Sequence, residues 1–281
     1  MSRQLCQQLG FALLSLATIM VVLPILLVVV YIVVQGTPAI SWEFITAMPR
    51  DGMHAGGVWP AIVGTLLLTV GTAIFAVPMG VAVAIYLAEY ASDTLLTRII
   101  RLAIINLAGV PSVVYGLFGL GLFVIFLQFG TSILAGSLTL AIMTLPVIIS
   151  TAEEALRAVP QSFRVVSLSL GATQWQTIRR IVLPQALSGI LTGVILGLER
   201  AAGETAPILF TVAAFFLPRL PRSIFDQTMT LPYHLFVIST QVPGMPIHIQ
   251  YGTALVLLVF VLSMNILATI TRSRFRARRQ W

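Results

Sequence analysis

The sequence predicts an all-α membrane protein, a polytopic bundle of about six transmembrane helices. Of its 281 residues, 58% are hydrophobic and only 9% are charged, and the mean hydropathy is +1.01. A soluble domain carries about a quarter charged residues, so this chain has too few to cover a surface that faces water. Lipid accommodates such a composition, because apolar side chains can face hydrocarbon.

Apolar runs place the individual spans, since crossing a bilayer takes about 20 mostly apolar residues. The expected spans are residues 11–34, 59–87, 99–127, 133–150, 186–216 and 251–270. The first is long and lacks a small-residue cleavage site, which favours a retained anchor over a cleaved signal peptide. Several runs exceed the minimum, which indicates tilt or helix that continues beyond the lipid.

These runs divide the chain into regions. We expect residues 1–57 to form an N-terminal anchor helix and a first outer loop, 58–271 the transmembrane domain, and 272–281 a basic cytoplasmic tail. Within the transmembrane domain, residues 151–184 form a long cytoplasmic loop. The tail is most simply a stop-transfer anchor on anionic lipid.

Arginines set the orientation. All 16 basic residues are arginines. With the N-terminus inside, most of them fall on the cytoplasmic side: Arg3, Arg98, Arg101, Arg157, Arg164, Arg179, Arg180, Arg272, Arg274, Arg276, Arg278 and Arg279. The outside keeps Arg50, Arg219 and Arg222, and Arg200 lies within an apolar run. This positive-inside bias predicts a multi-pass membrane protein with both termini cytoplasmic.

Composition also excludes several functions. The net charge of +7 does not indicate nucleic-acid binding, because no basic face coexists with a foldable soluble domain. The single cysteine, Cys6, excludes an internal disulfide and a cysteine metal cluster. Without lysine the chain cannot carry an ordinary Walker A loop, so any ATP that drives it must be bound by a partner.

The sequence holds no catalytic motif. His54, His234 and His248 fall in outer segments, and neither HExxH nor G-x-S-x-G is present. Glu153-Glu154 is more simply a solvated pair at a cytoplasmic helix end than a catalytic one. We therefore expect a transport subunit rather than an enzyme, with no cofactor or metal of its own. A secondary transporter or channel is an alternative, although no internal repeat is evident.

The cytoplasmic loop predicts a helical hairpin. Pro160 opens a helical pattern, and Gly171 interrupts it, since glycine takes a positive φ at a helix end without strain. Thr173 can cap a second short helix, which Pro184 should end. Trp175, Ile178 and Val182 would share one of its faces. Such a hairpin is either an ordinary connection at the membrane surface or an exposed helix that docks into a partner's groove.

Charged residues in the fifth span are the main candidate site. Glu199, Arg200 and Glu204 lie in the run LGLERAAGETAPILFT, where an unpaired charge is costly and normally faces the bundle interior. Arg200 and Glu204 are four residues apart, so they should lie on one helix face and pair. The pair either fixes helix packing or offers an arginine to a tetrahedral oxyanion, which its planar guanidinium suits.

A second candidate lies in the third span. The run NLAGVPSVVYG places three polar residues, Asn106, Ser112 and Tyr115, around the helix-breaking Gly109 and Pro111. Irregular backbone is tolerated at depth only where protein or water covers it. Small-residue helix packing explains the run, and a contribution to the substrate pathway is the other interpretation.

Several of these motifs resemble a known family. Gly171, followed after nine residues by Ile181-Val182-Leu183-Pro184, resembles the coupling loop of ABC importer permeases, although Ser167-Leu168-Ser169 replaces its leading Glu-Ala-Ala. The runs ERAAGETAPILFT, AIYLAEYA, NLAGVPSVVYGLFG and PYHLFVISTQVPG resemble A-type permeases of phosphate-specific ABC importers. The likeness extends over most of the chain from the second span onward.

The resemblance implies a type I importer fold and alternating access. It implies a heterodimer with a sister permease, two ATP-binding subunits that hold ATP and Mg, and a phosphate-binding protein outside. It assigns the substrate pathway to Arg200, Glu204 and Glu199, with Asn106, Ser112 and Tyr115. Contact with the ATP-binding subunit falls to the following residues: Gly171, Ala172, Trp175, Ile181, Leu183 and Pro184. A related importer for sulfate or molybdate is the nearest alternative.

Overall fold

The computed structural model describes residues 3–277, apart from the side chains of residues 3, 5, 6, 9 and 275–277. The part of the basic tail beyond residue 277 therefore lies outside the described residues. The described chain is helical apart from turns and two isolated β-bridges. It has five helices long and apolar enough to cross a membrane, or six if one bent pair counts as a span, which confirms the predicted fold class.

The helices follow one another in this order: α1 (Arg3–Gly36), α2 (Trp42–Thr46), α3 (Trp59–Ile85), α4 (Leu95–Ala108), α5 (Ser112–Gly119), α6 (Ile133–Arg157), α7 (Gln161–Ser169), α8 (Gln174–Thr177), α9 (Leu183–Gly203), α10 (Ala206–Thr211), α11 (Leu231–Thr240) and α12 (Ile247–Ala277). Short 3-10 turns η1 (Thr37–Ala39) and η2 (Asp51–Met53) flank α2, and π-helical turns η3 (Tyr86–Tyr90), η4 (Leu120–Phe126) and η5 (Ile178–Val182) continue longer helices.

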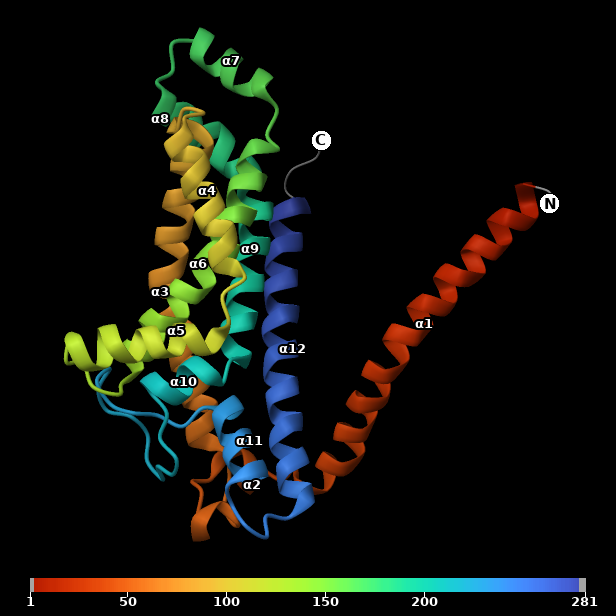
Figure 1. Ribbon diagram of the computed structural model, residues 1–281, viewed down its shortest axis with the longest axis vertical. Helices are drawn as coiled ribbons and strands as arrows, with labels where there is room; N and C mark the ends of the chain where they lie inside the picture. The colour runs from red at the N-terminus through yellow and green to blue at the C-terminus, as the bar shows by residue number, and fades with distance from the viewer. Residues whose placement is uncertain (1–2, 278–281) are drawn as a thin grey trace.

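The helices α3, α6 and α9 form the packed centre of the bundle (Figure 1). Small residues let them approach closely: a Cβ on Gly193 would lie 2.7 Å from the Thr151 side chain, and one on Gly80 would lie 2.7 Å from Ile148. Two thirds of the apolar stretch of α6 is buried within the chain. Membrane helices associate through such close packing, because lipid supplies no hydrophobic drive between them.

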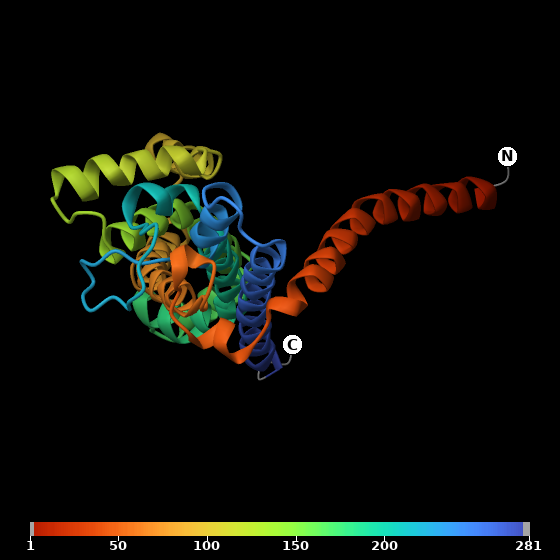
Figure 2. The ribbon, with the colours of Figure 1, turned by 90° about the horizontal axis from the view of Figure 1, so that it is seen from below.

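Helix α1 leaves the bundle. It meets α12 near Gly36, where Tyr31 and Tyr251 pack edge to face with ring centroids 5.2 Å apart, and then runs away from the other helices (Figures 1 and 2). None of its most apolar 18-residue stretch is buried. That surface requires lipid or another membrane protein around it.

The third expected span is present as two helices, sharply bent at the break that Gly109 and Pro111 mark in the sequence. Helix α4 ends at Ala108, and α5 with η4 continues at an angle of 102° to it, so that α5 crosses the bundle (Figure 1). Pro111 explains the break: it has an extended ψ of 140°, and its ring provides no N–H for the preceding turn.

The fifth expected span also differs from the structure at both ends. Helix α9 stops at Gly203, and Glu204 is extended with ψ of 140°. A short helix, α10, follows, with Pro207 in its first turn. At the other end Pro184 does not terminate the hairpin helix. It lies in the first turn of α9, and the wide turn η5 joins α8 to α9 in one 30-residue helical segment.

Candidate functional site

The intramembrane charges lie where α9 ends. Arg200 is in the last turn of α9, and its Nε lies 3.5 Å from Oε1 of Glu204. The predicted pair therefore forms, although Glu204 lies beyond the helix rather than on its face. Contact at this distance is at the limit of a hydrogen bond. The Arg200 side chain is 37% exposed within the isolated chain and that of Glu204 is 17% exposed, so the guanidinium keeps free donors.

Glu199 adds a carboxylate with an unsatisfied oxygen to this region. Its Oε1 is buried and has no hydrogen-bond partner among the described residues. A buried carboxylate oxygen without a donor is costly, and this chain supplies none in the described structure. Nearby Gly203 has no atom within 4 Å of where its Cβ would be, so nothing within the described chain fills that space.

The two interrupted helices meet. Helix α5, which follows the first break, packs on α10, which follows the second: a Cβ on Gly116 would lie 2.8 Å from the Phe210 ring and 3.0 Å from Pro207. Helix α10 begins at Ala206, two residues after Glu204, so this packing lies close to the Arg200–Glu204 pair in the chain. Two stretches far apart in sequence thus build one place where irregular backbone, an arginine and two carboxylates gather inside an apolar bundle.

The polar residues near the first break differ in their roles. The buried Tyr115 donates its hydroxyl hydrogen to the carbonyl of Leu107 at 2.7 Å, which ties α5 to α4 across the bend. Asn106 is exposed and Ser112 is half-buried, and neither side chain makes a hydrogen bond within the described part of the chain. The structure thus gives Tyr115 a role in holding the bend, and a place in the substrate pathway stays a prediction for Tyr115, Asn106 and Ser112 alike.

The hairpin has the expected turn. Gly171 follows α7 with a φ of +82°, and Thr173 with Gln176 forms a capping box at the start of α8. The hairpin extends beyond the end of the bundle (Figure 1). Its apolar side chains are largely exposed: Val165, Val166, Leu168, Leu170 and Trp175. An exposed apolar surface on a protruding hairpin indicates a partner.

The expected face of the second hairpin helix is only partly correct. Ile178 and Val182 are buried, whereas Trp175 is 53% exposed. Ala172, Ile181, Leu183 and Pro184 are half-buried. The structure therefore separates residues that anchor the hairpin to the bundle from those that it presents to its surroundings.

The hairpin is held by an ion pair that the sequence reasoning missed. Arg164 in α7 binds both carboxylate oxygens of Glu89 in η3, at 2.6 and 3.1 Å. Their side chains are 14% and 6% exposed. The only sequence signal was an acid at the end of the apolar run AIYLAEYA; the two residues are 75 positions apart, so no local pattern could pair them.

A second charge cluster lies beside it. Glu153 accepts hydrogen bonds from Arg101 in α4 and from Arg157, both at 2.9 Å. Glu153 is buried, so the prediction that it is solvated was wrong, whereas Glu154 is exposed as expected. Its position near the end of α6 suggested exposure to water, but two arginines from different helices cover it in the folded chain.

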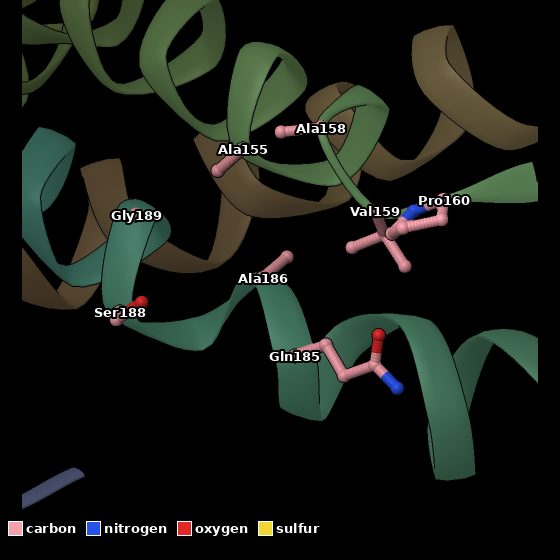
Figure 3. A pocket seen from close by; sticks show the side chains of 8 residues that line it. All are labelled: Ala155, Ala158, Val159, Pro160, Gln185, Ala186, Ser188 and Gly189. Carbon is pink, nitrogen blue, oxygen red and sulfur yellow. The ribbon is translucent and has the colours of Figure 1, made fainter. Parts of the chain in front are cut away.

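Cavities surround the base of the hairpin. One of about 380 Å³ opens between the end of α6 and the start of α9. Figure 3 shows Val159 and Pro160 facing Gln185 across it. No charged side chain lines it, so it does not fit an anion-binding site. Another, of about 600 Å³, lies between η3 and the hairpin and is lined by Glu89, Arg157 and Arg164.

A bundle with a protruding hairpin, interrupted helices and intramembrane charges is a transport subunit architecture, and comparison with known families identifies the class. The family model described as binding-protein-dependent transport system inner membrane component matches residues 76–279. The chain therefore belongs to this family. It is a multi-pass inner membrane permease component of an ABC importer, a family that implies an ATPase and a binding protein as partners.

Individual relatives refine the class. The probable ABC transporter permease YqgI of Bacillus subtilis is 34% identical over 252 residues, 85% of each chain. The phosphate transport system permease protein PstA 1 of Mycobacterium tuberculosis is 37% identical over 219 residues, 78% of this chain and 71% of that protein. PstA of Xylella fastidiosa is 34% identical over 236 residues, 83% of this chain and 80% of that protein.

Solved structures share the fold at low sequence identity. A bacterial ABC transporter that imports alginate superposes with a TM-score of 0.65 at 15% identity, covering 93% of this chain and 95% of that one. The inward-facing MetNI methionine transporter gives a TM-score of 0.63 at 16% identity, covering 76% and 94%. These likenesses confirm the ABC importer permease fold.

Proposed function

We propose that this chain is the A-type permease subunit of an ATP-driven importer that moves inorganic phosphate across the bacterial inner membrane by alternating access. The observation that carries the proposal is Arg200. Its guanidinium lies at the meeting point of two interrupted helices, partly exposed within the chain and only loosely engaged by Glu204 at 3.5 Å. Relatives named as phosphate permeases cover most of the chain.

The chemistry of this arrangement suits a passing oxyanion. Arginine offers several N–H donors in one plane, which match two oxygens of a phosphate. A site for transport must also release its ligand, and Glu204 and Glu199 do this by keeping the local charge from becoming strongly positive. Asn106, Ser112 and Tyr115 contribute polar groups to the same pathway in this proposal.

The partners follow from the same proposal. A sister permease completes a heterodimer, two ATP-binding subunits hold ATP and Mg, and a phosphate-binding protein delivers phosphate from outside. Both termini face the cytoplasm, and residues 151–184 contact one ATP-binding subunit through the exposed side chains of the hairpin. The segments 1–57, 58–271 and 272–281 then serve as anchor with outer loop, permease domain and cytoplasmic tail.

Uptake of radioactive phosphate by the complete transporter tests this function. Proteoliposomes that contain the chain, its sister permease and its ATPase should accumulate phosphate when ATP is enclosed with the ATPase and the binding protein is added on the opposite side. Excess unlabelled phosphate should abolish the signal, while sulfate and molybdate should not. Competition by sulfate or molybdate instead of phosphate would assign the importer to that oxyanion and refute the proposal.

A further inference from the structure

The turn η3, at the end of α3, is a junction between the hairpin and three helices. Its Glu89 carboxylate receives Arg164 of α7, and the Glu89 carbonyl accepts a hydrogen bond from Nε2 of Gln174 in α8 at 2.7 Å. Its Leu87 carbonyl accepts hydrogen bonds from Arg101 in α4 at 2.9 Å and from Arg157 in α6 at 3.3 Å. Two residues of this turn, Leu87 and Glu89, thus contact both arms of the hairpin and the helices α4 and α6.

The contact between Glu89 and Arg164 is the strongest of these. The guanidinium binds both carboxylate oxygens and also donates to the carbonyls of Val159 at 2.7 Å and Leu156 at 2.9 Å, at the end of α6. Charge-assisted bonds with two-point geometry are strong and directional. Since both side chains are largely buried, separating them would leave an uncompensated charge, so α7 and η3 should move as one body.

The junction also connects to the candidate pathway. Arg101 binds the Leu87 carbonyl and Glu153, and eight residues further along the same helix α4 comes to its break at Gly109. Eight residues of helix span about 12 Å. Beyond that break, α5 packs against α10 beside Glu204. A displacement of the turn η3 therefore has a continuous packed route to the place where the charges gather.

We infer that the Glu89–Arg164 pair is a positioning element that couples movement of the hairpin to the helices α3 and α4, and through them to the substrate pathway. This rests on the proposed function of the hairpin as the contact with an ATP-binding subunit. The pair binds neither nucleotide nor substrate. It determines how much of the hairpin displacement reaches the bundle.

Glu89→Gln and Arg164→Gln, each in the complete transporter in proteoliposomes, test the inference. Three quantities are measured: the yield of assembled complex, ATP hydrolysis stimulated by the binding protein, and phosphate taken up per ATP hydrolysed. Both variants should assemble and hydrolyse ATP, while uptake per ATP should fall about tenfold, within the range of a coupling free energy between two sites. The double variant should lose no more than either single one, because both remove the same contact.

Two further variants keep the outcome decisive. Arg164→Lys retains the charge without the two-point geometry and should fall between the wild type and Arg164→Gln; it also remains informative if the glutamine variants do not fold. Asp93→Asn removes the exposed Asp93–Arg98 pair at the same end of the bundle and should leave uptake per ATP unchanged.

Uptake per ATP at the wild-type level in assembled Glu89 and Arg164 variants would overturn the inference. A lower yield of complex with an unchanged ratio would overturn it as well, since it would show a purely structural pair. If wild-type vesicles take up no phosphate, the proposed function fails instead, and that result is distinguishable because it appears before any substitution is made.

Discussion

Two of the arginine–glutamate pairs, Arg200–Glu204 and Arg164–Glu89, differ in almost every physical respect. Arg200 and Glu204 are four residues apart, lie inside the membrane-spanning part, and meet at 3.5 Å with one partner 37% exposed. Arg164 and Glu89 are 75 residues apart, meet at 2.6 Å through two contacts, and are largely buried.

The two geometries indicate different roles for an arginine–glutamate pair. A loose pair at a helix end leaves donors free, so a ligand can compete for the arginine. A tight pair whose arginine makes four hydrogen bonds transmits force instead, because breaking a buried pair leaves an uncompensated charge. Geometry, rather than the residue types, thus distinguishes a site for a moving ion from a mechanical connection.

The largest expected effect follows removal of the loose pair's cation. Arg200→Gln should lower the initial rate of phosphate uptake about 100-fold, within the range for deleting one partner of a desolvated charged contact. The complex should still assemble, which copurification with the ATPase measures. Arg219→Gln, in the exposed loop between α10 and α11, is the control and should transport normally; normal uptake by Arg200→Gln would contradict the pathway role.

Exchanging the charges of Arg200 and Glu204 tests whether the arginine binds phosphate or only fixes helix packing. Glu204→Gln should reduce uptake because it removes the acid that orients Arg200, and the double variant Arg200→Glu with Glu204→Arg should remain inactive. Radioactive phosphate uptake by assembled complexes measures both. Recovery in the exchanged variant would indicate that the pair only fixes helix packing.

The hairpin turn at Gly171 tests whether the hairpin transmits movement from the ATP-binding subunit to the bundle. Gly171→Val should uncouple ATP hydrolysis from uptake, because a side chain at φ of +82° costs about 1–2 kcal/mol in the left-handed region and nothing lies within 4 Å to compensate. Gly171→Asn is the matched control, since asparagine tolerates that conformation better. Equal uptake per ATP in both variants and the wild type would show that the turn does not transmit movement.

Tyr115 tests the rigidity of the intramembrane site. Tyr115→Phe removes the hydrogen bond to the Leu107 carbonyl and should lower stability by about 1 kcal/mol, seen as a lower melting temperature in detergent. Uptake should fall only a few-fold, because Arg200 remains. Val114→Ala, on the exposed surface of the same helix, is the control; an unchanged melting temperature in Tyr115→Phe would mean that the bend does not depend on this bond.

The smallest expected effect concerns an exposed acid outside both pairs. Backbone N–H groups of Arg222 and Ser223 donate to Asp226 at 2.7 and 3.1 Å and hold the pKa of Asp226 below its usual 3.8. A lowered carboxyl pKa stabilises the folded loop above pH 3.8 and ceases to do so as the pH falls through the folded value.

Local hydrogen exchange in the segment 218–228 measures this effect. Protection of the Arg222 and Ser223 amides should be constant near neutral pH and lost in acid, relative to the intrinsic rates at each pH. Asp226→Asn should reduce protection already at neutral pH and remove the acid dependence. A variant that keeps both the protection and its acid dependence would exclude Asp226 as their cause.

Local sequence information predicted much of the architecture. Long apolar runs placed α1, α3, α6 and α12, because hydrocarbon selects for uninterrupted apolar helix. Gly171 and Thr173 predicted the hairpin turn, because a positive φ and a helix cap each require particular residues. The proximity of Arg200 to Glu204 was predicted from their spacing of four residues, and the pair forms although α9 ends at Gly203 and Glu204 is extended.

Other features depend on contacts between distant segments. Proline and glycine marked a weakness at 109–111, yet the 102° bend depends on the packing of α5 against α10. The end of α9 at Gly203 was missed because the run up to Phe216 is apolar throughout apart from its few charges. Glu153 was assigned to solvent because its two arginine partners come together only in the folded bundle.

The sequence by itself determined that the protein lies in a lipid bilayer, that it is helical and where its intramembrane arginine falls in the chain. These features follow from composition and from interactions within a few residues. Only the tertiary structure decided that two interrupted helices meet beside Arg200 and that Glu89 holds the hairpin through Arg164. Those arrangements join residues tens of positions apart, and the energy that selects them comes from packing and desolvation that no local pattern records.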